Sequence, residues 1–365
     1  MNYYIIPKNN FNIQIKLELT KDELIPFISH TLFFYMKNIC NQLCLLQETY
    51  SEIFETINKI VNPLEFIHSN VPGSSISVSK IKPQSNIFYE LLEIIQLFNI
   101  TDSFNLKSEL NIVSFTHNHE SINYLLNISR ENNLDNMFHY DFDYDTIIKQ
   151  FINSTTISYD LMIFDFKTED YCCSQRYIRN LILVTLLILK YQTNKGQCII
   201  KLDSILYRAV IDVIYLLSNL FDKVYIFKPI ISNVSKSDRY LICKDFNIQQ
   251  KNYDKLITDL EIILTNIQDQ ENSVNIYSIL DIDMPQLLIN RLEESNIIIG
   301  QQQIESYDQI INIFKNKNRE DKIENLKRIH IQKCIQWCEK YQLPHNKFID
   351  KVNIFLKPKD KSEMI

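Results

Sequence analysis

The chain has 365 residues, with 38 Lys and Arg against 44 Asp and Glu, so its formal net charge is −6. This acidic balance argues against a protein that coats nucleic acid through a broad basic field, because such binding neutralises phosphates. The chain has three glycines, Gly73, Gly196 and Gly300. A glycine-rich phosphate loop of the usual kind is therefore excluded, since such loops need positive φ angles and close backbone approach.

The apolar pattern predicts no membrane segment. No stretch reaches the roughly 18 apolar residues that a spanning helix needs, and the N-terminus lacks the pattern of a signal peptide. The longest apolar run, Leu181 to Leu189, is broken only by Thr185 and predicts a buried helix. Eight cysteines without a regular framework fit free thiols in a reducing compartment. We therefore expect a soluble, cytoplasmic protein.

Residues 1–79 are predicted to form a helical N-terminal region. Apolar side chains recur there at steps of three and four, from Leu24 to Leu46. The stretch from Asn70 to Ser85 concentrates Pro, Gly and Ser, which break regular structure. A domain boundary is expected near it.

Residues 80–250 alternate short apolar runs with longer amphipathic stretches. Five runs have strand length and composition: Leu110–Phe115, Leu161–Phe164, Cys198–Leu202, Val224–Phe227 and Tyr240–Cys243. Three stretches between them have helical spacing: Ser121–Arg130, Tyr177–Tyr191 and Leu206–Leu220. This alternation predicts an α/β fold with helices on both faces of a sheet. The last two strands lack room for a crossover helix, so we expect them to form an antiparallel edge pair.

Residues 251–365 show helical periodicity without strands and predict a helical C-terminal region. Its segment from Lys315 to Lys333 is dense in both charges and is best interpreted as a solvated helix face.

Three strings in the core resemble a known family. YDLMIFDF, GQCIIKL and VYIFKPIISNVSKSDRYLIC occur in the order and at the spacing seen in FtsJ-like 2'-O-ribose methyltransferases, especially the subgroup carried by large DNA viruses. KPQSNIFYELLEI resembles the helix that opens the core of that subgroup, and KCIQWCEKYQLP resembles its helical tail. The resemblance covers about Lys80 to Pro344. It implies a Rossmann-like class I methyltransferase core that ends in an antiparallel β-hairpin.

The resemblance also implies a catalytic site. The family uses a Lys, Asp, Lys, Glu tetrad whose central Lys takes the proton of the ribose hydroxyl. Asp165 falls on the tetrad Asp, Lys201 on the central Lys, Asp238 on the Glu, and Glu90 on the first Lys. We expect three carboxylates around one Lys201 to favour its ammonium form, which makes it a poorer base.

The resemblance places the cofactor, S-adenosylmethionine, at a turn that departs from the family pattern. The implied cofactor positions are Phe115, His117, Asn118 and Asp141, and His117 and Asn118 stand where the family has glycines. Their side chains would take space that the cofactor needs. Phe166 and Lys167 also stand at glycine positions. At two positions where the subgroup has Arg, which would offer positive charge to a nucleic-acid backbone, this chain has Asn86 and Asn233.

Two other clusters allow alternative interpretations. His117 and His119 could form a metal or acid-base pair, but no third ligand lies near them in sequence, which favours loop packing. His330, Cys334 and Cys338 recur at helical steps and could hold zinc. A buried thiol stripe beside Trp337 is the favoured interpretation, and no metal is expected.

These departures favour a degenerate methyltransferase-fold protein, impaired in catalysis, that acts as a scaffold or partner subunit and so has a protein partner. The first alternative is an active S-adenosylmethionine-dependent RNA cap 2'-O-methyltransferase. The second is a non-enzymatic RNA-binding module. The viral subgroup implies a place in the host cytoplasm or in the virion.

Overall fold

The computed structural model describes residues 3–8, 13–104, 107, 109–129, 136–151, 157–166, 175–247, 253–268, 274–316 and 320–346. The chain divides into two compact units. Met1–Asn62 and Pro83–Lys317 form the larger unit, and Pro63–Lys82 and Asn318–Ile365 form the smaller one.

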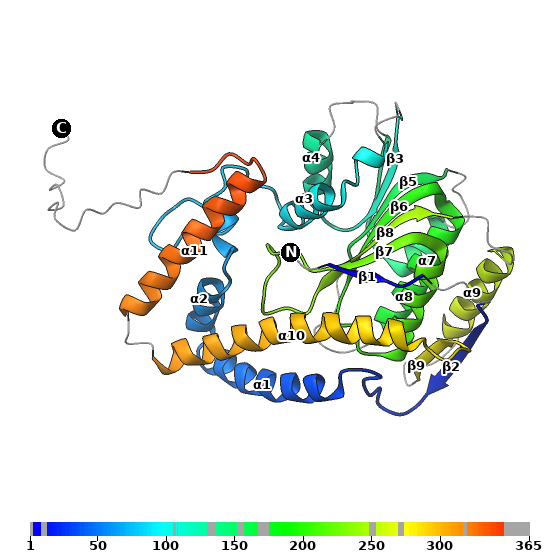
Figure 1. Cartoon of the computed structure of the whole chain (residues 1–365), viewed down its shortest axis with the longest axis horizontal. Helices are drawn as coiled ribbons and strands as arrows, with labels where there is room; N and C mark the ends of the chain where they lie inside the picture. Colours follow the sequence, from blue (N-terminus) through cyan, green and yellow to red (C-terminus); the bar gives the residue numbers. More distant parts are fainter. Residues whose placement is uncertain are drawn as a thin grey trace, which may run out of the picture. The chain divides into compact units, whose positions relative to one another are not determined.

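A seven-stranded mixed sheet forms the centre of the larger unit, in the order β1-β7-β8-β6-β5-β3-β4 (Figure 1). Its strands are β1 (Tyr3–Ile6), β3 (Asn111–Phe115), β4 (Asn136–Tyr140), β5 (Tyr159–Phe164), β6 (Gln192–Leu202), β7 (Phe221–Phe227) and β8 (Arg239–Phe246). The four strands β6, β5, β3 and β4 run parallel, whereas β8, β7 and β1 join by antiparallel pairing. All five predicted strands are present. The sequence analysis missed β4, whose sequence NMFHY has no β-branched residue.

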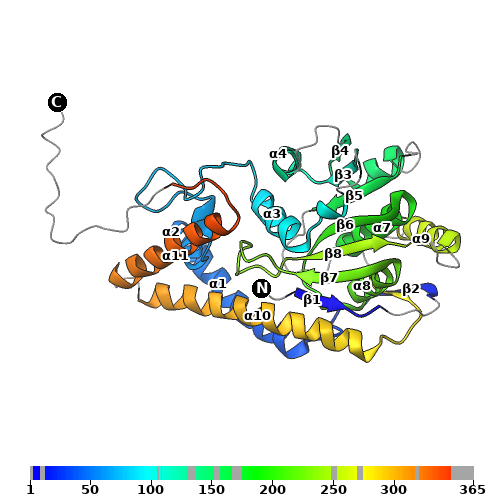
Figure 2. The ribbon, with the colours of Figure 1, turned by 45° about the horizontal axis from the view of Figure 1, so that its top comes forward.

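Helices cover both faces of this sheet, which confirms the predicted α/β fold (Figures 1 and 2). One face carries α3 (Ile87–Phe98) and α4 (His119–Ser129), and the other carries α7 (Gln175–Tyr191) and α8 (Arg208–Leu220). Helix α9 (Tyr253–Gln268) packs on α7. Short helical segments complete the unit: η2 (Asp102–Phe104), α5 (Tyr144–Thr146) and the π-helical η3 (Ile147–Phe151).

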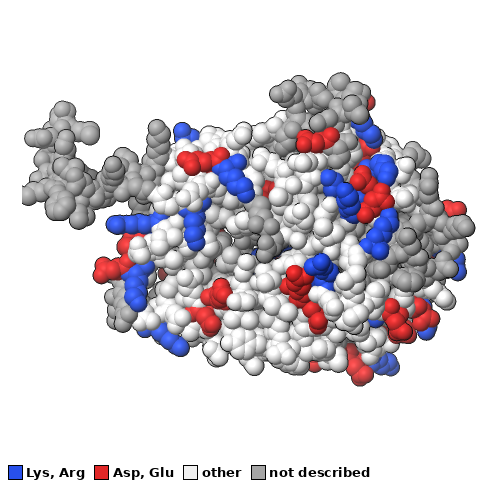
Figure 3. Space-filling view, viewed as in Figure 1, with Lys and Arg blue, Asp and Glu red and all other residues white. Residues whose placement is uncertain are grey.

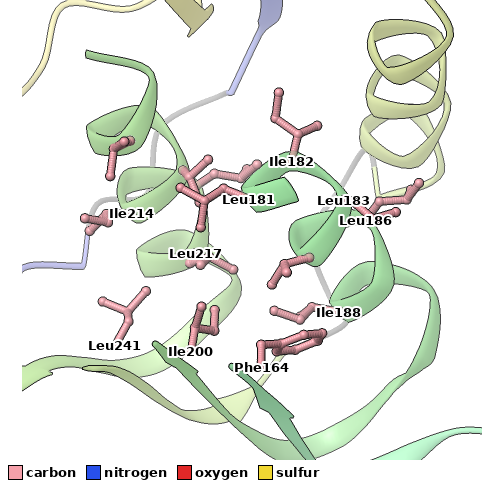
Figure 4. Close-up of a cluster of buried hydrophobic side chains, with 14 of the residues drawn as sticks. Phe164, Leu181, Ile182, Leu183, Leu186, Ile188, Ile200, Ile214, Leu217 and Leu241 are labelled. Carbon is pink, nitrogen blue, oxygen red and sulfur yellow. The ribbon is translucent and has the colours of Figure 1, made fainter. Parts of the chain in front are cut away.

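The core lies between α7, α8 and the sheet. The apolar run from Leu181 to Leu189 forms the centre of α7 and is buried, as predicted. Figure 4 shows side chains of α7 and α8 above Phe164, Ile200 and Leu241 of the central strands. Because this helix is apolar on nearly every side, it must be enclosed by α8, α9 and the sheet together.

The flanking regions differ from the sequence prediction at three strands. β1 pairs with β7, and β2 (Ile15–Thr20) pairs with β9 (Asn275–Leu280) in a separate two-stranded sheet. The prediction of helices alone was therefore wrong in these segments. The predicted antiparallel pairing of β7 with β8 is confirmed. However, β1 pairs with the outer side of β7 and forms the sheet edge, so β7 and β8 are not the edge pair.

The remaining helices of the larger unit are α1 (His30–Thr49), α2 (Ser51–Val61) and α10 (Gln286–Lys315). They share a small apolar cluster of their own, formed by Met36, Ile39, Leu43, Ile57, Val61, Tyr307 and Ile310.

The smaller unit combines α11 (Glu320–Lys340) with η1 (Glu65–Ile67). His330, Cys334 and Cys338 are buried on α11, and the Cys334 thiol lies 3.6 Å from the carbonyl oxygen of Pro63. Burial raises the pKa of both thiols. Within the described residues, no three His, Cys, Asp or Glu side chains are arranged to hold a metal.

Candidate functional site

The candidate site lies on the face of the sheet that α3 covers. β6 and β8 are antiparallel, with Lys201 directly opposite Tyr240. Paired residues of an antiparallel ladder point to the same face, so both side chains point toward α3. Helix α3 contributes Glu90, which is 7% exposed. The loop before β8 contributes Asp238.

These four side chains are in direct contact. The Lys201 ammonium lies 3.0 Å from Glu90 Oε2 and 3.5 Å from Asp238 Oδ2. The Tyr240 hydroxyl donates a short hydrogen bond to the same oxygen of Glu90. Three of the four predicted tetrad positions, Glu90, Lys201 and Asp238, are therefore brought together, and Tyr240 joins them.

A second lysine, Lys228, was missed by the sequence analysis. Its ammonium donates to the carbonyl oxygens of Lys236, at 2.7 Å, and Asp238, at 3.0 Å, and lies 3.4 Å from Asp238 Oδ1. The three expected carboxylates do act on Lys201, but Asp238 lies between two lysines, so the site also holds a second cation that the sequence analysis did not anticipate. Lys228 directly follows the last residue of β7, and this position at a strand end was the available signal.

The charges around Lys201 determine its protonation. Burial by itself lowers the pKa of Lys201, but the carboxylates of Glu90, Asp165 and Asp238 outweigh this effect and raise it above the ordinary value. Burial lowers the pKa of Lys228, and its three hydrogen-bond acceptors favour the ammonium form. Lys201 is therefore an ammonium ion at neutral pH and has no lone pair with which to accept a proton.

Asp165 follows β5, at the carboxyl end where ligand crevices open in such sheets. Its Oδ2 accepts hydrogen bonds from the Thr116 hydroxyl and from the Asn118 side-chain amide, both at 3.2 Å. The tetrad Asp and the predicted cofactor turn are thus joined directly. The negative charge of Asp165 contributes to raising the pKa of Lys201.

The predicted cofactor residues His117 and Asp141 also bind each other. His117 Nδ1 lies 2.9 Å and His119 Nε2 lies 3.2 Å from the same oxygen of Asp141. These hydrogen bonds lower the pKa of Asp141. The two histidines therefore tie the turn after β3 to the end of β4.

Aromatic rings fill the space beside this turn. Phe115, the last residue of β3, is fully buried and stacks on Phe164, with ring centroids 5.1 Å apart. Phe142 and Phe166, which follow β4 and β5, are buried with centroids 4.7 Å apart. Lys167, the other predicted departure at this place, lies outside the described residues.

Comparisons with known proteins support the assignment of the fold. Residues 107–246 match the family model described as FtsJ-like methyltransferase. The core has an FtsJ-like methyltransferase fold. The matched segment extends from just before β3 to the end of β8 and contains three of the four tetrad positions.

Similar solved structures include human methyltransferase-like protein 13 in complex with SAH. The two chains share 12% sequence identity with a TM-score of 0.27, and the match covers 50% of this chain and 93% of that chain. A probable spermidine synthase from Corynebacterium glutamicum has 12% identity, a TM-score of 0.29, and coverage of 58% and 89%. A search of curated proteins gave no match.

The side chains at the predicted cofactor position make contacts with one another. Hydrogen bonds already engage the side chains of His117, Asn118 and Asp141, and the buried rings of Phe142 and Phe166 occupy the neighbouring strand ends.

None of the described helices combines the length and the apolar character that a membrane span requires.

Proposed function

We propose that this FtsJ-like methyltransferase-fold protein is impaired in catalysis and acts as a scaffold or partner subunit. The observation that carries the proposal is the set of contacts that side chains at the cofactor position make with one another. Asn118 binds Asp165, His117 binds Asp141, and Phe142 packs on Phe166. In this proposal, the strand ends that would bind a ligand bind one another and stabilise the fold.

The state of Lys201 supports the same proposal. A general base needs a pKa near the operating pH, whereas the carboxylates near Lys201 raise its pKa above the ordinary value. Glu90, at the position of the first tetrad Lys, is the nearest of these carboxylates. In an active tetrad a cation at this position would instead repel the central ammonium and lower its pKa.

A surface on α1 and α2 supports a role in binding a protein partner. Five large apolar side chains on or between these helices are between 43% and 65% exposed: Phe34, Tyr35, Leu45, Tyr50 and Ile53. Exposed large apolar side chains, where they lie together, are typical of interaction surfaces. In the proposal this surface binds the partner.

Isothermal titration with S-adenosylmethionine tests the loss of cofactor binding. We expect the natural protein to show no binding at cofactor concentrations up to about 1 mM, which corresponds to binding weaker than about 4 kcal/mol. The double variant His117→Gly/Asn118→Gly removes the two side chains at the turn and should bind more tightly. Micromolar binding by the natural protein contradicts the proposal.

An active RNA cap 2'-O-methyltransferase is the second candidate, and the contact of Lys201 with Asp238 favours it. Transfer of a labelled methyl group to capped RNA, abolished by Lys201→Ala, would establish this function in place of the first. The third candidate, a non-enzymatic RNA-binding module, has weaker support. Positive and negative side chains are interspersed on the face in Figure 3, and the net charge is −6. Our proposal retains the viral subgroup, with a place in the host cytoplasm or the virion.

A further inference from the structure

A cavity of about 470 Å³ opens on the opposite side of β8 from the candidate site. Successive residues of a strand point to opposite faces, so Arg239 faces away from the side that carries Tyr240. The cavity lies between the segment that leads into α1, helix α10 and the connection from β6 to α8. Its volume is within the range of small-molecule pockets.

Apolar side chains form the walls of this cavity, among them Leu24, Leu32, Phe33, Met36 and Leu206. Gly300 of α10 shapes one wall, because a Cβ at this position would lie 2.6 Å from Leu32 Cδ2. The glycine therefore allows α10 to approach Leu32 closely. The walls suit an aliphatic or aromatic body.

Polar residues of the lining include one group of Ser204, Ser237, Arg239, Asn296 and Gln303, which we call the polar end, and also Glu23, Lys37, Asn41 and Asn275. Arg239 is 3% exposed. Its Nε donates to the carbonyl oxygen of Ser237 at 3.1 Å, and its Nη1 donates to Asn296 Oδ1 at 2.7 Å. A guanidinium has five N–H groups, so these two neutral acceptors leave most of its hydrogen-bonding capacity unused.

The charge of this guanidinium is also without a direct counterion. Within the described residues, no carboxylate oxygen forms an ion pair with Arg239. The carboxylates of Asp203 and Asp238 favour its charged form without direct contact. One oxygen of Asp203 already accepts bonds from the Ser204 backbone N–H and the Ser237 hydroxyl. Burial lowers the pKa of Arg239 to about 10, so it remains charged at neutral pH. A buried charge without a directly paired counterion is unfavourable, and an anion in the cavity would relieve this cost.

We propose that this cavity binds a small amphipathic anion, with its apolar body against the α1 and α10 walls and its carboxylate on Arg239. Planar guanidinium and carboxylate groups pair through two parallel hydrogen bonds, which gives the polar end its selectivity. Neutral and cationic compounds with the same apolar body should bind less well. The proposal is independent of the candidate site, since the cavity and that site use opposite faces of β8.

Cysteine protection in the full, unaltered chain tests this proposal. Cys40 lines the cavity and is half-buried, whereas Cys44, one turn further along α1, is exposed. We would measure the alkylation rate of each thiol by peptide mass spectrometry with octanoate, octanamide or octylammonium. Octanoate should slow the alkylation of Cys40 at least tenfold and leave Cys44 unchanged, and its half-protecting concentration should be at least tenfold lower than that of the other two compounds. Equal protection by octanamide or octylammonium, or no protection by octanoate, overturns the proposal.

A variant pair tests the role of the guanidinium. Arg239→Met should weaken protection by octanoate at least tenfold, while the exposed Arg291→Met on α10 should leave it unchanged. Undiminished protection in a folded Arg239→Met variant overturns the proposal. If Arg239→Met does not fold, the comparison of the three head groups in the unaltered protein still decides it.

Discussion

The ion pair between Lys201 and Glu90 permits a quantitative test of the site's electrostatics. We consider the variants Lys201→Met and Glu90→Gln, singly and together, as a double-mutant cycle. At the observed separation of 3.0 Å, an effective dielectric constant of about 20 gives an attraction of about 5.5 kcal/mol. Desolvation of the two charges offsets part of this attraction, so we expect a coupling energy of about 2 to 3 kcal/mol.

Urea unfolding of the four proteins supplies the required free energies of unfolding. Lys201→Met alone should cost about 3 to 5 kcal/mol, because it leaves buried Glu90 without its cation. The double variant should be more stable than the sum of the single changes predicts.

An exposed ion pair provides the matched control. Arg291 and Glu294 on α10 are only 2.7 Å apart, but both side chains are about half exposed. Their coupling should be below about 0.5 kcal/mol, because water screens the charges. If the coupling of Lys201 with Glu90 is as small as that of the control pair, burial does not strengthen this interaction and the electrostatic argument is wrong.

Three further predictions concern pH and packing. Two lysines lower the pKa of Asp222 to about 2. The ionised carboxylate therefore stabilises the fold by about 1 kcal/mol after discounting for solvent exposure. This stabilisation is present above pH 4 and should be lost as the pH falls toward 2. Acid titration of the unfolding free energy checks this, with Asp222→Asn as the variant that should lose the effect. Burial raises the pKa of Asp212 to about 6, so the folded state retains a proton that the unfolded chain has released. Stability should therefore fall by up to about 3 kcal/mol between pH 4 and pH 6, and Asp212→Asn should remove this change in urea unfolding. Gly196→Ala would place a Cβ 2.1 Å from the side-chain amide nitrogen of Gln192. This contact would break the hydrogen bonds that the Gln192 amide donates to the carbonyl oxygens of Tyr159 and Asp160. We expect a cost of about 2 to 3 kcal/mol and a lower melting temperature, and an unchanged melting temperature would contradict this packing argument.

The sequence predicted the central fold because its signals are local. The run from Leu181 to Leu189 is apolar over more than two helical turns, and only enclosure on all sides satisfies such a helix. The strand runs were visible for the same reason, since each is short, apolar and bounded by polar residues. The two strands β1 and β2 near the N-terminus were missed because partners far along the chain define them. Tertiary context overrides weak local propensity in such segments.

The sequence by itself, through its resemblance to the family, predicted which residues stand at the tetrad and cofactor positions, and that Glu90 reverses a charge there. Only the tertiary structure decided that Lys228 shares Asp238, that Asn118 binds Asp165, and that Arg239 lies in a cavity without a direct counterion. The physical reason is that charge and hydrogen bonding act over a few ångströms in space. Residues such as Lys201 and Glu90, 111 positions apart, interact only once the sheet and α3 have brought them together.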